Sequence, residues 1–250
     1  MLKYIIAVIL IVPLLLVMTP LMLVMAYKPK WFSFNFRYAY VRFLVKWVCI
    51  SLRVKITVEG KENLPEKGFF ATPNHQSLFD SLSLIAANKN PLTFVAKKEV
   101  KNMPYIGLFV KILGGFFLDR ENIRQSLKMM KDLENFMIEN PDVGVIIFPE
   151  GTRTRDPELA IDEFKGGSYK VAYKTMRPVT PTVMTGTPRI LTLKWYWVHH
   201  VNIRYGKTLS FDEYKEYDSN KLAELCREYS VTNLNELHKI NDCRKKPDDK

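Results

Sequence analysis

The chain has 250 residues, of which 47% are apolar, and a formal net charge of +11. The apolar share excludes a disordered polyelectrolyte, and the length is sufficient to bury the core of one ordinary domain. The three cysteines lie far apart with no CxxC pair. We therefore expect a reducing compartment and neither a disulfide framework nor a zinc site.

Basic residues are concentrated in the N-terminal quarter of the chain. Residues 1–58 contain eight Lys and Arg and no Asp or Glu, whereas the other 192 residues contain 29 basic and 26 acidic side chains, a net of +3. A nucleic-acid-binding domain usually has its basic patch on the folded body. The distribution therefore argues against nucleic acid as a partner.

The same quarter contains the longest apolar run. Tyr4–Ala26 are 23 residues without a charge. At about 1.5 Å per residue such a helix reaches roughly 35 Å, enough to cross a hydrocarbon core of about 30 Å. A signal peptide has an apolar region of only about 7–15 residues, so a retained membrane segment is favoured. Pro13 and Pro20 would kink the helix and leave a shallow or re-entrant insertion open.

An aromatic and basic stretch follows at residues 31–52. Aromatic rings interleaved with Lys and Arg are typical of a helix at the lipid headgroups, although a helix packed on the folded body is the alternative, and both can hold together. The excess of Lys and Arg after the apolar run predicts that the rest of the chain faces the cytoplasm, at the inner or plasma membrane in a bacterium. We expect residues 1–52 to form a membrane unit and residues 53–250 to form one α/β domain.

Short β-rich segments alternate with helical patterns along residues 53–250. In chain order, strands are expected at 54–58, 68–72, 92–95, 116–118, 143–148, 179–184 and 201–205, with helices at 77–87, 99–113, 122–138, 168–175 and 222–240. Such alternation predicts an α/β fold with a mixed, mostly parallel sheet flanked by helices.

The segment NHQSLFD, residues 74–80, follows the second expected strand. His75 would then lie at the carboxyl end of a strand, where α/β folds place their sites. A turn with Ser77 as a possible helix N-cap could fold the Asp80 carboxylate back to the imidazole. This contact would fix the tautomer and leave the other ring nitrogen as a general base. On spacing alone, a surface loop with an unrelated cap is the alternative.

Three further segments contain groups that could bind an anion or line a site. GGFFLDR places Arg120 after a short strand, where it is either a phosphate ligand or part of a surface ion pair. FPEGTR places Gly151, Thr152 and Arg153 after a buried strand, where they form either an anion site or a simple turn. PVTPTV, residues 178–183, is preceded by a Lys-Gly-Gly turn at Lys165 and by itself indicates only structure. No GxxxxGK[ST] or GxGxxG nucleotide loop is present.

Together these four segments resemble the motifs of the glycerolipid acyltransferase family, specifically the 1-acylglycerol-3-phosphate acyltransferases. NHxxxxD, F-[IL]-D-R, FPEGTR and a proline-bounded apolar strand all occur here in the family's order, over roughly residues 60–190. The resemblance implies transfer of an acyl group to the sn-2 hydroxyl of lysophosphatidic acid, giving phosphatidic acid. The donor would be an acyl thioester on coenzyme A or acyl carrier protein, and the reaction needs no metal and no other cofactor.

The resemblance also implies roles for individual residues. His75 would be the general base and Asp80 its orienting partner, without an acyl-enzyme. The acceptor would be bound by Arg120, Glu150, Gly151, Thr152, Arg153 and Lys165. Glu150 is matched either to acceptor binding or to site geometry, and the fourth motif is expected to line the acyl or acceptor site.

Two alternatives remain open. Within the family, the acceptor could be glycerol-3-phosphate or another lysophospholipid. From another class, the chain could be a non-catalytic, membrane-anchored binder of anionic lipids, against which the intact His75 and Asp80 argue. In either case the lipid bilayer is an expected partner.

Overall fold

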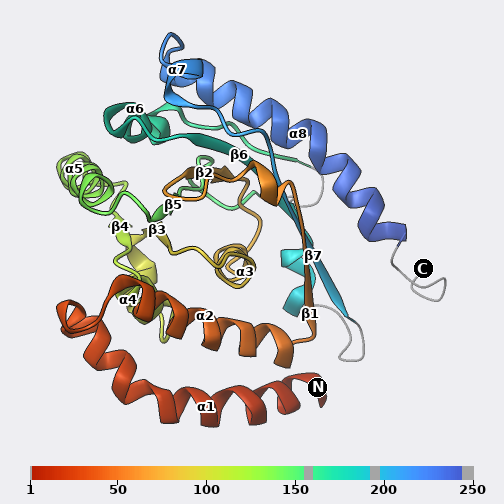
Figure 1. Cartoon of the computed structure of the whole chain (residues 1–250). Helices are drawn as coiled ribbons and strands as arrows, with labels where there is room; N and C mark the ends of the chain where they lie inside the picture. The colour runs from red at the N-terminus through yellow and green to blue at the C-terminus, as the bar shows by residue number, and fades with distance from the viewer. Residues whose placement is uncertain (1, 155–159, 192–197, 244–250) are drawn as a thin grey trace.

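A seven-stranded sheet runs through the middle of the molecule in the computed structural model, which describes residues 2–154, 160–191 and 198–243 (Figure 1). The strands are β1 (Val54–Glu59), β2 (Phe70–Pro73), β3 (Leu92–Lys97), β4 (Phe116–Leu118), β5 (Gly144–Ile146), β6 (Val179–Thr185) and β7 (His199–Tyr205). Their order is β1-β7-β6-β2-β5-β3-β4, and only the β6–β7 pair is antiparallel. The predicted mixed, mostly parallel sheet is confirmed, and β2 to β6 have their carboxyl ends at one edge.

Helices cover both faces of the sheet and close two separate apolar cores. One core lies under α1 (Leu2–Tyr27), α2 (Phe34–Ser51), α3 (Phe79–Ala87) and α4 (Ile106–Ile112). The other lies under α5 (Ile123–Glu139), α6 (Lys170–Thr175), α7 (Phe211–Tyr214) and α8 (Ser219–Cys243). Short 3-10 turns, which link these elements, are η1 (Pro29–Trp31), η2 (Lys61–Asn63), η3 (Lys98–Asn102), η4 (Gly166–Tyr169) and η5 (Thr187–Leu191).

The single helix predicted at residues 99–113 is wrong. The segment is divided into η3 and α4, with Pro104 and Tyr105 between them, and Tyr105 has a positive φ of 58°. Proline disfavours helical geometry in the residue before it, and a bulky side chain at positive φ cannot continue a helix. The other predicted elements are present, with ends shifted by a few residues; the predicted helix at 168–175 begins as η4 and continues as α6.

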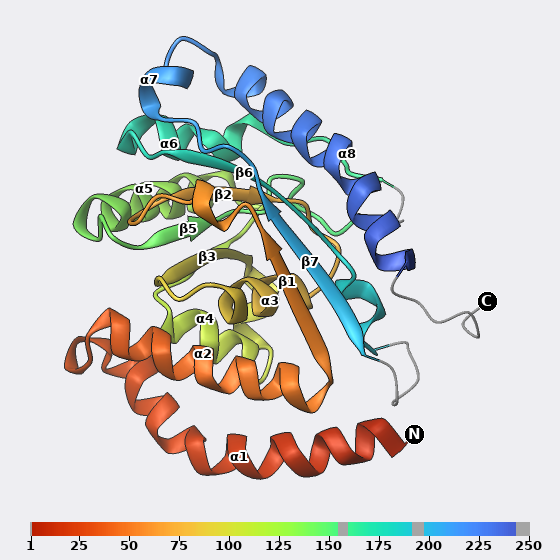
Figure 2. The same cartoon turned by 45° about the vertical axis from the view of Figure 1, so that its right-hand side comes forward.

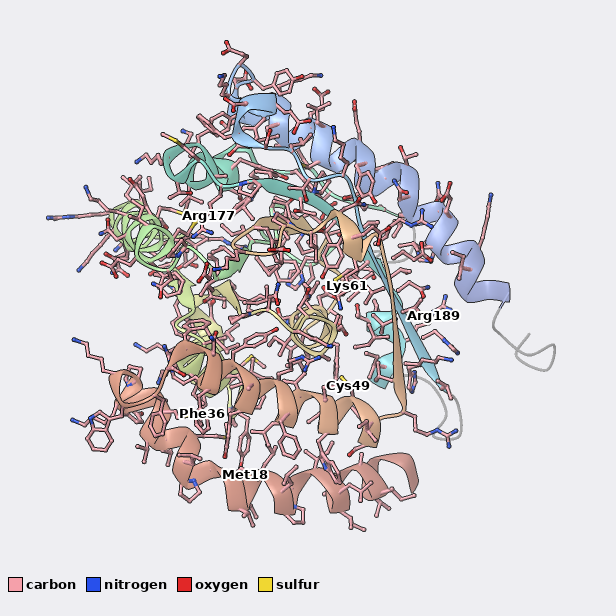
Figure 3. The ribbon with its side chains drawn as sticks, viewed as in Figure 1. Met18, Phe36, Cys49, Lys61, Arg177 and Arg189 are labelled. Atoms are coloured by element: carbon pink, nitrogen blue, oxygen red, sulfur yellow. The ribbon has the colours of Figure 1, made fainter. Side chains whose placement is uncertain are left out.

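The first two helices form an antiparallel hairpin along one side of the molecule (Figure 2). Trp47 donates its indole N–H to the Leu10 carbonyl at 2.9 Å, and the Tyr40 hydroxyl donates to the Met18 carbonyl at 3.0 Å. In Figure 3, Met18 lies on the side of α1 that faces α2, and Cys49 on the side of α2 that faces the sheet. The hairpin is therefore joined to the body through α2.

Helix α2 has one buried face and one exposed face. Its buried side chains, which face the body, are Tyr38, Val41, Leu44, Val45 and Cys49. Phe36, Phe43, Trp47 and Ile50 remain exposed on the other side. The helix therefore packs on the folded body and still presents aromatic side chains outward, so the structure agrees with one of the two sequence interpretations of this helix and leaves room for the other.

Helix α1 is long and apolar enough to cross a membrane by length and composition. Its segment Ile5–Tyr27 has a mean hydropathy of 2.8, and in the described part of the chain it is the one helix of this kind. Ile9, Leu16 and Val17 are more than 60% exposed on its outer side. This exposed apolar helix indicates association with a membrane.

Arg177 fixes the carboxyl end of α5 to the sheet. Its guanidinium donates to the carbonyls of Met137 at 2.5 Å, Asn140 at 2.9 Å and Pro141, and Figure 3 shows it beside α5. Gly68 has φ +49°, and a Cβ there would collide with this guanidinium. The arrangement satisfies carbonyls that the end of the helix leaves without partners.

Candidate active site

His75 lies in the turn between β2 and α3, and a buried carboxylate holds its ring. The Nδ1 atom of His75 lies 2.8 Å from Oδ2 of Asp80, and the same oxygen accepts the backbone N–H groups of Gln76 at 2.7 Å and Ser77 at 2.8 Å. The Thr187 hydroxyl donates to the other oxygen, Oδ1. The Asp80 side chain is fully buried, whereas the His75 side chain remains 19% exposed.

Two residues that the sequence analysis did not single out support this turn. Asn74 donates to the Met184 carbonyl at 3.1 Å and accepts the Met184 N–H at 2.8 Å, so its amide binds β6 as a neighbouring strand would. Thr187 comes from η5, which follows β6. Asn74 belongs to the NHxxxxD segment, but Thr187 lies 107 residues from Asp80, and no local pattern signals that contact.

Ser77 accepts the Phe79 N–H on its hydroxyl at 3.3 Å. The helix begins at Phe79, so Ser77 lies one residue before the N-cap position at Leu78. The expectation that Ser77 is the N-cap is therefore wrong by one residue, although its hydroxyl still supports the start of α3.

Glu150 is a buried residue whose carboxylate connects the turn at His75 with the segment that follows β5. Its Oε1 accepts the His75 backbone N–H at 2.6 Å, and its Oε2 accepts the Thr154 hydroxyl and the Asp162 N–H, the latter at 3.2 Å. Burial raises the pKa of its carboxyl, and these three hydrogen bonds partly oppose the shift. Glu150 is 2% exposed and is not among the described residues that line the cavity. Its contacts therefore favour a role in maintaining the geometry of the site over direct binding of the acceptor.

A cavity of about 900 Å³ opens in front of His75. Its polar lining includes His75, Arg120, Gly151, Thr152, Arg153 and Lys165, which the sequence analysis placed in one site. These residues follow the carboxyl ends of β2, β4 and β5, apart from Lys165, whose backbone N–H donates to the Pro149 carbonyl at 3.1 Å. The imidazole stacks on Phe148 with ring centroids 4.2 Å apart, which fixes the plane of the ring.

Two cations converge on Gly151. This residue has φ +77°, and a Cβ built on it would lie 3.3 Å from Nζ of Lys165 and 3.6 Å from Cζ of Arg120. Partial desolvation lowers the pKa of Arg120, and Glu99 partly offsets this. A guanidinium is far too basic to lose its proton through such a shift, so Arg120 stays charged at neutral pH. A small anion beside Gly151 would thus have two positive neighbours and room for close approach.

The fourth motif does not line the cavity, and the expectation that it would is wrong. Strand β6 is buried along its whole length between β2 and β7, and residues 178–183 are absent from the described lining. The segment supports the site from behind, because its neighbour Met184 binds Asn74.

Other nucleophiles and metal ligands are poorly placed among the described residues. Cys49 and Cys226 are buried, and burial raises the pKa of these thiols to about 12 and about 11. Neither cysteine is among the described lining residues. The described residues contain no group of three His, Cys, Asp or Glu side chains that could hold a metal ion.

Comparison with protein families gives a match to the model described as Acyltransferase over residues 55–185, more than half of the chain. The chain belongs to the acyltransferase family. The matched region contains the His75–Asp80 pair, Arg120 and the segment from Glu150 to Lys165. It thus includes every residue that the sequence analysis assigned to the site.

Individual relatives agree with this family assignment. The chain is 29% identical over 191 residues to the 1-acyl-sn-glycerol-3-phosphate acyltransferase of Saccharomyces cerevisiae, a match that covers 75% of this chain and 62% of the yeast protein. It is 28% identical over 200 residues to the enzyme of that name from Borreliella burgdorferi, covering 77% and 78% of the two chains. A crystal structure of the acyltransferase PlsC from Thermotoga maritima superposes with a TM-score of 0.71 over 94% of this acyltransferase and 93% of that chain. At 24% identity this likeness shows the fold.

Proposed function

We propose that this acyltransferase is membrane-bound and transfers a fatty acyl group from an acyl thioester to the sn-2 hydroxyl of lysophosphatidic acid, giving phosphatidic acid. One observation carries the proposal: a His–Asp pair and converging cations share a single cavity that also has apolar walls. The names of the yeast and Borreliella relatives support the choice of acceptor.

His75 acts as the general base. The Nδ1–H group of His75 donates a hydrogen bond to the Asp80 carboxylate, which leaves the lone pair of Nε2 for the acceptor hydroxyl. As that hydroxyl attacks the thioester carbonyl carbon, its proton passes to Nε2 and a tetrahedral intermediate forms. The C–S bond then breaks, and the thiolate leaves with the proton from the imidazolium. Atoms balance without an acyl-enzyme, and Asp80 stabilises the transient imidazolium.

The acceptor's phosphate lies beside Gly151. Arg120 and Lys165 converge there, and Arg153 and Thr152 line the same cavity and add donors. Guanidinium groups bind phosphate in a bidentate manner, and the glycine permits close approach. Glu150 holds the loops of His75 and Gly151 in register without itself touching the phosphate.

The donor's acyl chain lies against the wall formed by α3 and α4. Leu82, Ile85, Phe109 and Leu113 line the cavity there, and each is less than 9% exposed. An aliphatic chain on these side chains leaves water and gains about 0.8 kcal/mol for each methylene buried. The thioester carrier is coenzyme A or acyl carrier protein.

The membrane unit is residues 1–52, and the α/β body is residues 53–250. The unit's apolar outer side and its six basic residues with no acidic ones fit a surface of anionic lipid headgroups. The hydrogen bonds of α1 to α2 favour a hairpin that lies against the bilayer together with the body. The excess of Lys and Arg after the apolar run supports a position of that body on the cytoplasmic face.

The decisive assay uses the purified full chain in detergent micelles. Lysophosphatidate and glycerol-3-phosphate are each offered with acyl-coenzyme A and with acyl carrier protein thioesters, and products are identified by mass spectrometry. Formation of phosphatidate with lysophosphatidate as the preferred acceptor supports the proposal. Preference for glycerol-3-phosphate would reassign the acceptor, and tight lipid binding without any transfer would make the chain a lipid binder.

A further inference from the structure

The lining of the cavity comes from both faces of the sheet. Leu82, Phe94 and Phe109 belong to the core under α1 to α4, whereas Ile147, Leu118 and Met130 belong to, or pack against, the core under α5 to α8. The cavity therefore lies at the carboxyl ends of β3, β4 and β5, and His75, Arg120 and Lys165 line it together with both sets of apolar side chains. The two apolar walls differ, because the α3–α4 wall is buried and the α5 wall is open.

The open wall is the first half of α5. Ile123 and Leu127 are 76% and 67% exposed, yet both line the cavity together with Met130. These positions are four and three residues apart, so they form one stripe on the helix. Aliphatic side chains this exposed at the edge of a cavity indicate a site for an apolar ligand.

We propose that this stripe, Ile123, Leu127 and Met130, binds the acyl chain that the acceptor already carries. The inference rests on the proposed function, whose product has two acyl chains that meet at one glycerol. One molecule of donor and one of acceptor each need an apolar wall, and the cavity offers one on each face of the sheet.

The positions of Arg120 and Lys165 indicate which wall binds the acceptor's chain and which binds the donor's chain. Arg120 approaches Gly151 and lies three residues before Ile123, so a phosphate held there places the rest of the acceptor next to the first turn of α5. Lys165 follows Phe164, which belongs to the same core as the buried side of α5. The acceptor's chain thus extends over α5, and the donor's chain occupies the wall of α3 and α4.

The consequence is that α5 selects a lysophospholipid over the chainless glycerol-3-phosphate. Burial of one methylene is worth about fourfold in affinity, and an exposed stripe gains a part of that for each methylene it covers. Acceptors with longer chains should therefore have lower KM values, through contacts that short chains cannot reach.

The test compares the double variant Ile123→Asn/Leu127→Asn with the wild type in detergent micelles. Ile138→Asn is the matched control, because Ile138 is 61% exposed on the same helix and outside the described cavity lining. For oleoyl lysophosphatidate, the double variant should raise KM by about tenfold. For hexanoyl lysophosphatidate, the rise should be less than about twofold. The donor's KM and chain-length preference should stay unchanged, and the control should match the wild type.

Three outcomes would overturn the inference. A changed preference for the donor's chain length would show that the donor's chain binds at α5. Loss of binding to anionic vesicles, with unchanged KM in micelles, would show that the stripe contacts the membrane. An unchanged chain-length dependence in an active double variant would leave the stripe without a ligand. A wild-type chain inactive towards every lysophosphatidate is a different result, because it contradicts the proposed function itself.

Discussion

The turn around His75 and the N-terminal hairpin are built in opposite ways. In the turn, both oxygens of Asp80 and both oxygens of Glu150 accept hydrogen bonds, and the two carboxylates are almost completely buried. The hairpin is held by apolar contacts and a few side-chain hydrogen bonds, and large aliphatic side chains of α1 remain exposed.

This difference indicates that the turn around His75 is organised for chemistry, whereas the hairpin is organised for contact with a lipid bilayer. A satisfied polar network holds a group in one orientation, because each alternative would leave a buried polar atom without a partner. An exposed apolar face is stabilised when a membrane covers it.

The largest effect is expected from His75→Ala. A positioned general base contributes about 10²- to 10⁴-fold to a rate, so kcat for acyl transfer should fall by about 10³-fold. Circular dichroism and vesicle sedimentation should match the wild type, because the His75 imidazole is not part of either apolar core. Turnover within about tenfold of wild type would exclude His75 as the base.

The hairpin is tested by the double variant Ile9→Glu/Val17→Glu. Both positions are exposed on α1, so the fold should tolerate the change, while two charges in the hydrocarbon region should lower partition into vesicles by at least about tenfold. Val231→Glu on α8 is the matched control, since Val231 is exposed and lies outside the hairpin. Undiminished sedimentation of the double variant would show that this face of α1 does not contact lipid.

A smaller effect is expected from Thr187→Val, which removes the hydroxyl that donates to Asp80. We expect kcat to fall by roughly tenfold with both KM values unchanged, because the loss of one hydrogen bond to a buried carboxylate loosens the partner of His75. Thr187→Ser should restore the rate. If Thr187→Val has the kcat of the wild type, or if Thr187→Ser has a kcat as low as that of Thr187→Val, Thr187 does not position the His75–Asp80 pair.

The smallest effect concerns the pH dependence of stability. Because burial raises the pKa of Glu150 above its ordinary value of 4.5, the folded state retains this proton at pH values where the unfolded chain loses it. The contribution of Glu150 to the free energy of unfolding should therefore fall as the pH rises from about 4.5 towards neutrality. Denaturant titrations of wild type and Glu150→Gln across this range measure the difference in slope, and parallel curves would contradict the shift.

Much of the fold was predictable from the sequence because its signals are local. The apolar strand before FPEGTR and the helical period of residues 122–138 appear as β5 and α5. The helix predicted at 99–113 failed because one proline and one residue at positive φ outweigh a favourable apolar pattern.

The grouping of the polar residues around one cavity was predictable from the sequence, whereas the contacts that support them from behind were not. Short motifs contain the polar lining, since all of these residues except Lys165 lie in the segments that follow strands. The contact of Thr187 with Asp80 and the position of β6 behind the site depend on strand order, which no local pattern encodes. The stripe on α5 has the same apolar spacing as a core face, so its exposure at the cavity could be seen only in three dimensions.

Direct transfer through His75 is the central claim, and a single-turnover experiment tests it most directly. The full chain is mixed with radiolabelled acyl-coenzyme A, with and without lysophosphatidate, and quenched in acid. We predict labelled phosphatidate only when the acceptor is present and no label on the protein at any time. With His75→Ala, labelled phosphatidate should form about 10³-fold more slowly, again without label on the protein. Acyl label that accumulates on a side chain and then passes to lysophosphatidate would contradict the account.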